Sequence, residues 1–291
     1  MTNPYLPNPA AKGIARIYDG AEDLALCPED KSVFPPDDNW TLALAAALTT
    51  LHDRGSLDNQ RILELGAGSG VNMLGLFAMG HFFEQPPSYI GLDLTCEAVA
   101  ACERLAECHD FRDDIDLVCS NLLQNIPDFK LEGVSKVIAC LPQVVWDYEA
   151  QGREPEPREF ADYYVLPEQR VPEDEYALGL LARALDEIRE RIPKASVVFN
   201  VAGRQGDLSE QLFADHGFPH IEKVVSRIIP HDPLTSLTSF AKWEDQSGNA
   251  CRFFADANAE NSISAAEAEE RRVAQAPVFH ELFVVEASPE K

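Results

Sequence analysis

A glycine-rich turn directly after an apolar run limits what this chain can fold into more than any other feature of its sequence. The run is 61-RILEL-65, and the turn behind it contains Gly66, Gly68 and Gly70. Glycine tolerates positive φ and lets a ligand approach the backbone closely, so this pattern predicts a strand, a tight turn and then a helix. Such a unit is typical of a parallel sheet covered by helices on both faces.

The rest of the chain repeats the alternation of strand and helix. We expect α/β architecture: a Rossmann-like, doubly wound, mostly parallel sheet of seven strands. Its domain would span 58–291, with a cap segment over 1–57 and a lid insertion over 143–172, where charges and prolines break the rhythm. Further strands are predicted at 89–95, 115–121, 136–142, 195–203, 221–229 and 279–287, with 250–257 as another candidate, and helices at 38–55, 73–79, 96–110, 174–192, 207–216 and 262–275.

Composition excludes several classes of partner. The 291 residues carry a formal net charge of −25, which repels nucleic acids and anionic membranes. The first residues lack an apolar leader, and no apolar run is long enough to span a membrane, so we expect a cytoplasmic protein. Seven cysteines without a C-x-x-C pair are expected to be reduced, and no spacing suits a metal site.

The glycine turn has an acidic residue at each side of the expected ligand. Glu64 lies two places before the first glycine, and Asp93 ends the next strand, where a carboxylate can accept hydrogen bonds from both ribose hydroxyls. Val71 stands where a dinucleotide-binding turn needs its third glycine. Glu64 would repel a pyrophosphate but not a cationic sulfonium cofactor, so S-adenosylmethionine is favoured over NAD. Asn121 follows the third strand at the expected level of an adenine, unless it only starts a turn.

These residues resemble the class I S-adenosylmethionine-dependent methyltransferases over most of 36–230. The resemblance implies that the cofactor's methionyl part is held by Glu64, Gly66 and Gly68, its ribose by Asp93, and its adenine side by Asn121 and Leu122.

The loop after the fourth strand bears on the methyl acceptor. It reads 138-IACLPQVVW-146 and lacks the Asn or Asp of the Asn-Pro-Pro-Tyr type of loop that orients nitrogen acceptors. Asp147 and Tyr148 follow, but they also suit a solvated lid, as do Tyr163 and Tyr164. A thioether acceptor needs no general base, because its methylation releases no proton. It needs in-line alignment and exclusion of water.

Within that class, the loop 140-CLPQV-144 resembles the Cys-Ile-Pro-Gln loop of methionine S-methyltransferases. Further similarity covers 173-EDEYALGLLARA-184, 199-FNVAGRQG-206 and 35-PPDDNW-40. The resemblance implies methyl transfer from S-adenosylmethionine to free L-methionine, giving S-methylmethionine and S-adenosylhomocysteine. In bacteria that step can open a route to dimethylsulfoniopropionate.

The remaining site residues follow from where the loops should lie. Leu141 is expected at the cofactor, and Pro142 and Gln143 at the transferred methyl group. Arg204 offers a fork for the substrate carboxylate, although it could pair with a surface acid instead. The other expected substrate-binding residues are Asn200, which could also satisfy backbone, Trp40, which could also be core, and Asp38.

Three alternatives remain open at this point. The chain could methylate another small thiol, thioether or amine. It could be a non-catalytic module that binds S-adenosylmethionine, or a dehydrogenase, although Val71 and Glu64 disfavour the latter. The histidines form no evident catalytic group in the sequence, and we expect a homo-oligomer.

Overall fold

The computed structural model describes residues 39–68, 70–79, 88–108, 115–143, 171–233 and 235–290. The chain divides into two compact units: Met1–Cys140 with Arg191–Phe199, and Leu141–Glu190 with Asn200–Lys291. Strand β5 (Ser196–Ala202) passes from the first unit into the second. Most of the predicted cap and lid falls outside the described residues, so both segments stay predictions.

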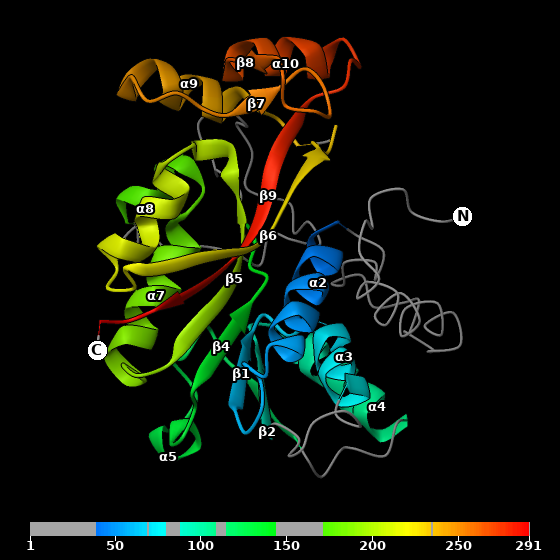
Figure 1. Cartoon of the computed structure of the whole chain (residues 1–291), viewed down its shortest axis with the longest axis vertical. Helices are drawn as coiled ribbons and strands as arrows, with labels where there is room; N and C mark the ends of the chain where they lie inside the picture. Colours follow the sequence, from blue (N-terminus) through cyan, green and yellow to red (C-terminus); the bar gives the residue numbers. More distant parts are fainter. Residues whose placement is uncertain are drawn as a thin grey trace. The chain divides into compact units, whose positions relative to one another are not determined.

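The first unit is built on a parallel sheet with the strand order β3-β2-β1-β4-β5 (Figure 1). The chain adds β2 and β3 on one side of β1 and then crosses to place β4 on the other side, so the order reverses at β1. Ligands of doubly wound sheets bind at the carboxyl ends of the strands beside such a reversal. The strands are β1 (Arg61–Leu65), β2 (Ser88–Asp93), β3 (Ile115–Cys119), β4 (Lys136–Ala139) and the first part of β5.

Among the described residues of this unit, four helices accompany the sheet: α2 (Asn39–Asp53), α3 (Val71–Met79), α4 (Cys96–Cys108) and the short α5 (Asp128–Leu131). Helix α2 packs against α3, and α4 packs against β2 and β3 (Figure 1). The helix predicted at 38–55 ends as expected, because Gly55 takes a φ of +71° and its N–H donates to the His52 carbonyl at 2.8 Å.

The second unit contains the long antiparallel pair β6 (His220–Pro230) and β9 (Phe279–Ser288). The sheet order continues from β5 through β9 to the short strands β7 (Phe253–Phe254) and β8 (Ser262–Ile263). A 3-10 turn η6 (Gly203–Gln205) and helix α8 (Leu208–Asp215) follow β5.

A small subdomain between β6 and β9 has its own hydrophobic core. It consists of α9 (Thr238–Ser247), β7, β8 and α10 (Ala265–Val273), which lie together in Figure 1. Phe240, Trp243 and Phe253 are buried at its centre. Helix α10 begins with a side-chain cap, as the Ser264 hydroxyl accepts from the Glu267 N–H at 3.1 Å.

The strand count differs from the prediction. The described residues form nine strands, seven of at least four residues and two, β7 and β8, of two residues each. The two short strands belong to the small subdomain, where the sequence predicted one loosely bounded strand at 250–257. Within the described residues, no helix has the length and apolar character needed to cross a membrane.

The single helix predicted at 174–192 is wrong. The structure has a 3-10 helix η5 (Pro172–Tyr176) and then α7 (Gly179–Arg191). Ala177 breaks the helix with a left-handed φ of +68°. Gly179 is needed at the restart, because a Cβ there would lie 1.9 Å from the Asp174 carboxylate. That carboxylate binds Arg183 at 2.9 Å instead of capping a long helix.

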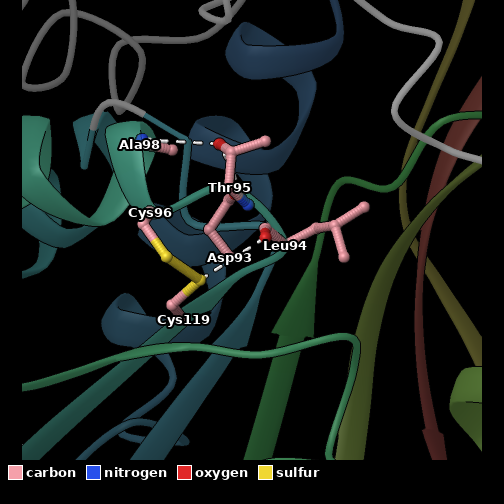
Figure 2. The surroundings of a disulfide bond; sticks show 6 residues. All are labelled: Asp93, Leu94, Thr95, Cys96, Ala98 and Cys119. Carbon is pink, nitrogen blue, oxygen red and sulfur yellow. Dashed lines mark hydrogen bonds between the residues drawn. A yellow bond between two sulfur atoms is a disulfide. The ribbon is translucent and has the colours of Figure 1, made fainter.

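The expectation that all cysteines are reduced is also wrong for one pair. Cys96 and Cys119 form a disulfide with Cα atoms 5.1 Å apart, as Figure 2 shows. The pairing follows from the parallel register, which places Cys119 beside Asp93, while Cys96 begins the helix three residues further on. The bridge therefore ties together the carboxyl ends of β2 and β3.

Candidate functional site

The glycine turn after β1 is held by backbone hydrogen bonds to the neighbouring strand. The N–H groups of Gly66 and Ala67 both donate to the Leu92 carbonyl, at 2.8 and 3.0 Å. Gly66, Gly68 and Gly70 have φ values of +71°, +55° and +82°, which side chains rarely adopt. The turn thus has a fixed course across the carboxyl ends of β1 and β2.

Two of these glycines serve different purposes. A Cβ on Gly70 would lie 2.8 Å from Met73 and 3.1 Å from Cys102, so this glycine permits close packing of the following helix. A Cβ on Gly68 would meet nothing within 4 Å. The space over Gly68 is open, as required where a ligand lies directly on the backbone.

Asp93 fixes the geometry of this open position. Its carboxylate accepts from the Gly68 N–H at 2.9 Å, the Thr95 N–H at 2.9 Å and the Thr95 hydroxyl at 3.1 Å. Figure 2 shows Asp93 next to Thr95 and the disulfide at the end of β2. The carboxylate is half-buried. Because each carboxylate oxygen can accept two hydrogen bonds and three are made here, Asp93 retains capacity for one further hydrogen bond, from a ligand hydroxyl.

Glu64 does not face open space. It is fully buried, and its two oxygens accept hydrogen bonds from the Tyr89 hydroxyl and, at 2.8 Å, from the Asn72 amide. Burial, with a smaller contribution from the negative charge of Asp93, raises the pKa of Glu64 to about 7 against the opposing effect of those two donors. Direct contact with the cofactor therefore stays a prediction. The observed contacts give Glu64 a role in positioning β1 against β2 and α3.

Replacing Glu64 by glutamine should change how stability depends on pH. The folded pKa of Glu64 lies above its ordinary 4.5, so the buried carboxylate destabilises the fold progressively as pH rises from 4.5 to about 7. Glu64→Gln removes this cost, and its unfolding free energy should gain about 3 kcal/mol on wild type between pH 4.5 and 8. Denaturant unfolding at several pH values measures the difference.

The exposed Glu97, also in the first unit, provides the control. Glu97→Gln should follow the wild-type pH curve in parallel. If the unfolding free energy of Glu64→Gln depended on pH in the same way as that of wild type, the raised pKa of Glu64 would be contradicted.

The predicted adenine-side residues follow β3. The Ser120 N–H donates to the Asp93 carbonyl at 2.7 Å, which places the start of this segment beside the end of β2. The Asn121 carbonyl accepts from the Gln124 N–H at 3.0 Å, and Leu122 has a left-handed φ of +47°. Asn121 therefore does start a turn, and this leaves a contact with adenine as a prediction.

Gln143 lies in the second unit, and both ends of its side-chain amide make hydrogen bonds. Its Nε2 donates to the Asn200 carbonyl at 2.8 Å, and its Oε1 accepts from the Ala202 N–H at 2.9 Å. The side chain thus pairs with β5 as another strand would. Gln143 is buried, so its predicted contact with a transferred methyl group is not tested by these bonds, which give it a positioning role.

Arg204 follows β5 and is buried, with only 4% of its surface exposed. Its Nη2 donates to the Gln143 carbonyl at 2.7 Å, and its guanidinium carbon lies 5.1 Å from the centre of the Phe240 ring. Within the described residues no carboxylate pairs with Arg204, and its Nε has no hydrogen-bond partner. Burial lowers the pKa of Arg204 to about 10. The alternative of a surface arginine is therefore wrong.

The other predicted site residues divide between the units. Leu141 is buried and Pro142 half-buried in the second unit, directly before Gln143. Trp40 is half-buried at the start of α2 in the first unit. Asp38 lies outside the described residues. The structure thus brings together Gly68 and Asp93 in one unit, and Gln143, Asn200 and Arg204 in the other.

Two histidines in the second unit, His231 and His280, were not among the site residues predicted from the sequence. His280 is buried in β9, and its ring centre lies 5.6 Å from that of His231. The pairing of β6 with β9 joins them, because Ile229 lies opposite His280 in the register. The available signal was the position of His280, which alternates with Leu282 and Val284 on one face of the predicted strand, while Glu281 lies on the other. Across the described ranges, no three residues of the metal-binding types gather into a candidate metal site.

Fold and site define a Rossmann-like α/β protein with a nucleotide-type edge, formed by a glycine turn after β1 and a carboxylate at the end of β2. No family model matches the chain. It is similar to methionine S-methyltransferases from plants: that of Zea mays is 28% identical over 253 residues, 78% of this chain, and that of Arabidopsis thaliana is 25% identical over 278 residues, 87% of this chain.

These relatives are much longer than this chain. The similarity covers 22% of the maize protein and 25% of the Arabidopsis protein, so the chain spans about a quarter of their length. Among solved structures, a geranyl diphosphate methyltransferase in complex with SAM aligns over 99% of this chain and 93% of its own, with 13% identity and a TM-score of 0.39.

Proposed function

We propose that this chain is an S-adenosylmethionine-dependent methyltransferase that methylates the thioether sulfur of free L-methionine, giving S-methylmethionine and S-adenosylhomocysteine. The observation that carries the proposal is the similarity to methionine S-methyltransferases over 78–87% of this chain. The loop 140-CLPQV-144 supports the same substrate class. A place in dimethylsulfoniopropionate synthesis, a cytoplasmic location and a homo-oligomer stay predictions.

The first unit suits the cofactor. S-adenosylmethionine, when bound, supplies a methyl group activated on a sulfonium. The open backbone at Gly68, with Gly66 beside it, would hold the methionyl part, and the Asp93 carboxylate would accept from a ribose hydroxyl. Asn121 and Leu122 would contact the adenine side of the cofactor. Glu64 supports this arrangement by fixing β1 against Tyr89 and Asn72.

The second unit suits an amino-acid substrate. Arg204 is a buried cation without a carboxylate partner among the described residues, so a substrate carboxylate would complete its pairing. Gln143 holds Arg204 through its carbonyl and β5 through its amide, which orients Asn200 and Arg204 together. Attack by a thioether releases no proton, so the chain needs to align the sulfur and exclude water, without a general base.

Product analysis tests the proposal directly. Purified protein is incubated with methyl-deuterated S-adenosylmethionine and L-methionine, and the products are read by mass spectrometry. We expect S-methylmethionine carrying one deuterated methyl group, with S-adenosylhomocysteine in equal amount. Cofactor binding without this product would reject methionine as acceptor, and a panel of small thiols, thioethers and amines would follow. Failure of the whole panel would favour a non-catalytic binding module.

A pair of glycine variants separates the ligand-binding turn from general backbone strain. Gly68→Ala and Gly133→Ala both place a side chain at a left-handed position, with φ of +55° and +78°, and neither Cβ meets a protein atom closer than 3.8 Å. Each should lose about 1 kcal/mol of stability. Only Gly68→Ala should also weaken S-adenosylmethionine binding, by about tenfold or more, because its methyl group enters ligand space. Calorimetry measures both affinities, and equal affinities would contradict the proposed position of the cofactor.

A further inference from the structure

The second unit contains a buried polar side chain, His280, that has no role in the proposed reaction as described so far. His280 is 3% exposed, and neither of its ring nitrogens has a hydrogen-bond partner within the described residues. A buried imidazole without partners costs free energy that a leucine of similar size would not. A buried polar group without a partner calls for an explanation, and a ligand that pairs with it is one.

The surroundings of His280 supply a cation and aromatic walls. A Cβ on Gly203, the residue before Arg204, would lie 3.0 Å from the Cβ of Glu281, the residue after His280, so η6 packs directly on β9 here. The charge of Arg204 also acts on both His280 and His231. The ring of His231 packs edge-on against His280 at 5.6 Å and against Phe253 at 6.2 Å. Phe253 in turn contacts Phe240, over whose ring the Arg204 guanidinium lies. The guanidinium thus lies on one end of a connected series of rings that leads through Phe240, Phe253 and His231 to His280.

The orientation of His231 is set by the chain itself. Its Nε2 lies 2.9 Å from the Thr235 carbonyl, so this nitrogen carries the proton and donates. His231 thereby has a fixed ring against which His280 rests. His280 remains as the polar side chain of this cluster whose hydrogen-bonding capacity is unused, together with the Nε of Arg204.

Burial next to Arg204 keeps His280 neutral, since its pKa lies well below the ordinary value for histidine. A neutral imidazole still offers one N–H donor. It therefore adds a hydrogen bond for an anion without adding positive charge. That matters where a sulfonium product forms, because a second cation would repel it.

We propose that His280 is a second donor to the substrate carboxylate, beside the Nε of Arg204, and that His231 positions the His280 ring. The inference rests on the proposed function for the identity of the substrate as an amino acid. It adds a requirement of its own: the ligand of this cluster carries a single carboxylate, and His280 contributes to its recognition.

A binding measurement tests the cluster independently of catalysis. The probe is 3-(methylsulfanyl)propanoate, which has the thioether and carboxylate of methionine without the ammonium. The matched amine 3-(methylsulfanyl)propylamine has no carboxylate. Calorimetry should show that His280→Leu weakens binding of the acid by about 10- to 100-fold, as expected for one hydrogen bond to a charged group. Affinity for the amine should not change.

The control is His220→Leu, the same substitution at an exposed position on β6, opposite the far end of β9. It should leave the acid affinity unchanged. A stability readout separates binding from structure: His280→Leu should unfold at the same or a higher temperature than wild type, because an apolar side chain replaces an unpaired imidazole. His280→Gln, which keeps an N–H donor, should restore part of the affinity.

Each result bears on the proposal separately from the reaction. Equal losses for acid and amine, or an unchanged acid affinity in His280→Leu, would overturn the role of His280. Acid binding that depends on His280, in a protein that forms no S-methylmethionine, would support the cluster and reject methionine as the methyl acceptor.

Discussion

Asp93→Ala is expected to weaken S-adenosylmethionine binding by about 100-fold, the equivalent of one hydrogen bond between a carboxylate and a ribose hydroxyl. The variant also removes the acceptor of the Gly68 and Thr95 N–H groups, so the backbone of the glycine turn is no longer held in its ligand-binding conformation. S-adenosylhomocysteine should lose as much affinity, because it has the same ribose. Calorimetry with both ligands measures the effect.

Asp116→Ala is the matched control for that experiment. Asp116 is a half-exposed carboxylate of β3, paired with Lys130 at 2.6 Å. Its removal should leave both affinities within a factor of about two, since surface ion pairs contribute little. Asp93→Asn, which retains one acceptor oxygen, should fall between wild type and alanine. An unchanged affinity in Asp93→Ala would refute the ribose role.

Arg204→Met is expected to raise the KM for methionine by about 1,000-fold, because a desolvated charge pair with the carboxylate is lost. The dissociation constant of S-adenosylmethionine should change by less than about threefold, since Arg204 and Asp93 serve different molecules. The introduced methionine side chain at position 204 keeps an unbranched apolar chain over the Phe240 ring, so the fold should tolerate the substitution. Steady-state kinetics in both substrates, with calorimetry for the cofactor, separates the two effects.

Arg252→Met controls for the loss of positive charge in this strongly acidic chain. Arg252 is half-exposed and pairs with Asp207 at 2.6 Å, and its N–H donates to the Arg204 carbonyl. Kinetics close to wild type are expected. An equal loss of affinity for methionine and cofactor in Arg204→Met would mean that the residue supports the fold and does not read the carboxylate.

The parallel sheet could be predicted from the sequence because its signals are local. Apolar runs such as 61-RILEL-65 end in turn residues, and the glycines after β1 have few alternatives to the observed turn. The break at Ala177 could not, since alanine favours helix, and the restart depends on Gly179 and on the Asp174–Arg183 pair. A side-chain contact between residues nine apart in the sequence outweighed the helix propensity of alanine there.

In the candidate site, the position of the residues at the strand ends could be predicted, but the side-chain contacts could not. Asp93 and Gly68 lie together because strand ends meet at one edge of a parallel sheet, which a sequence pattern does indicate. The enclosure of Glu64 by Tyr89 depends on a contact 25 residues away. The Gln143 amide is taken up by backbone groups of β5, and no pattern around Gln143 foretells that.

The Cys96–Cys119 bridge makes the oxidation state of a sample part of any measurement on this protein. The two cysteines are 23 residues apart in the sequence. In the chain-entropy treatment, a bridge over that separation lowers the entropy of the unfolded chain and raises the free energy of unfolding by about 3 kcal/mol. Material handled with a dithiol reductant and material handled without it are therefore two covalent species with different melting temperatures. Because the bridge joins the strand end that bears Asp93 to the segment before Asn121, cofactor affinities from the two preparations are comparable only when free thiols have been counted.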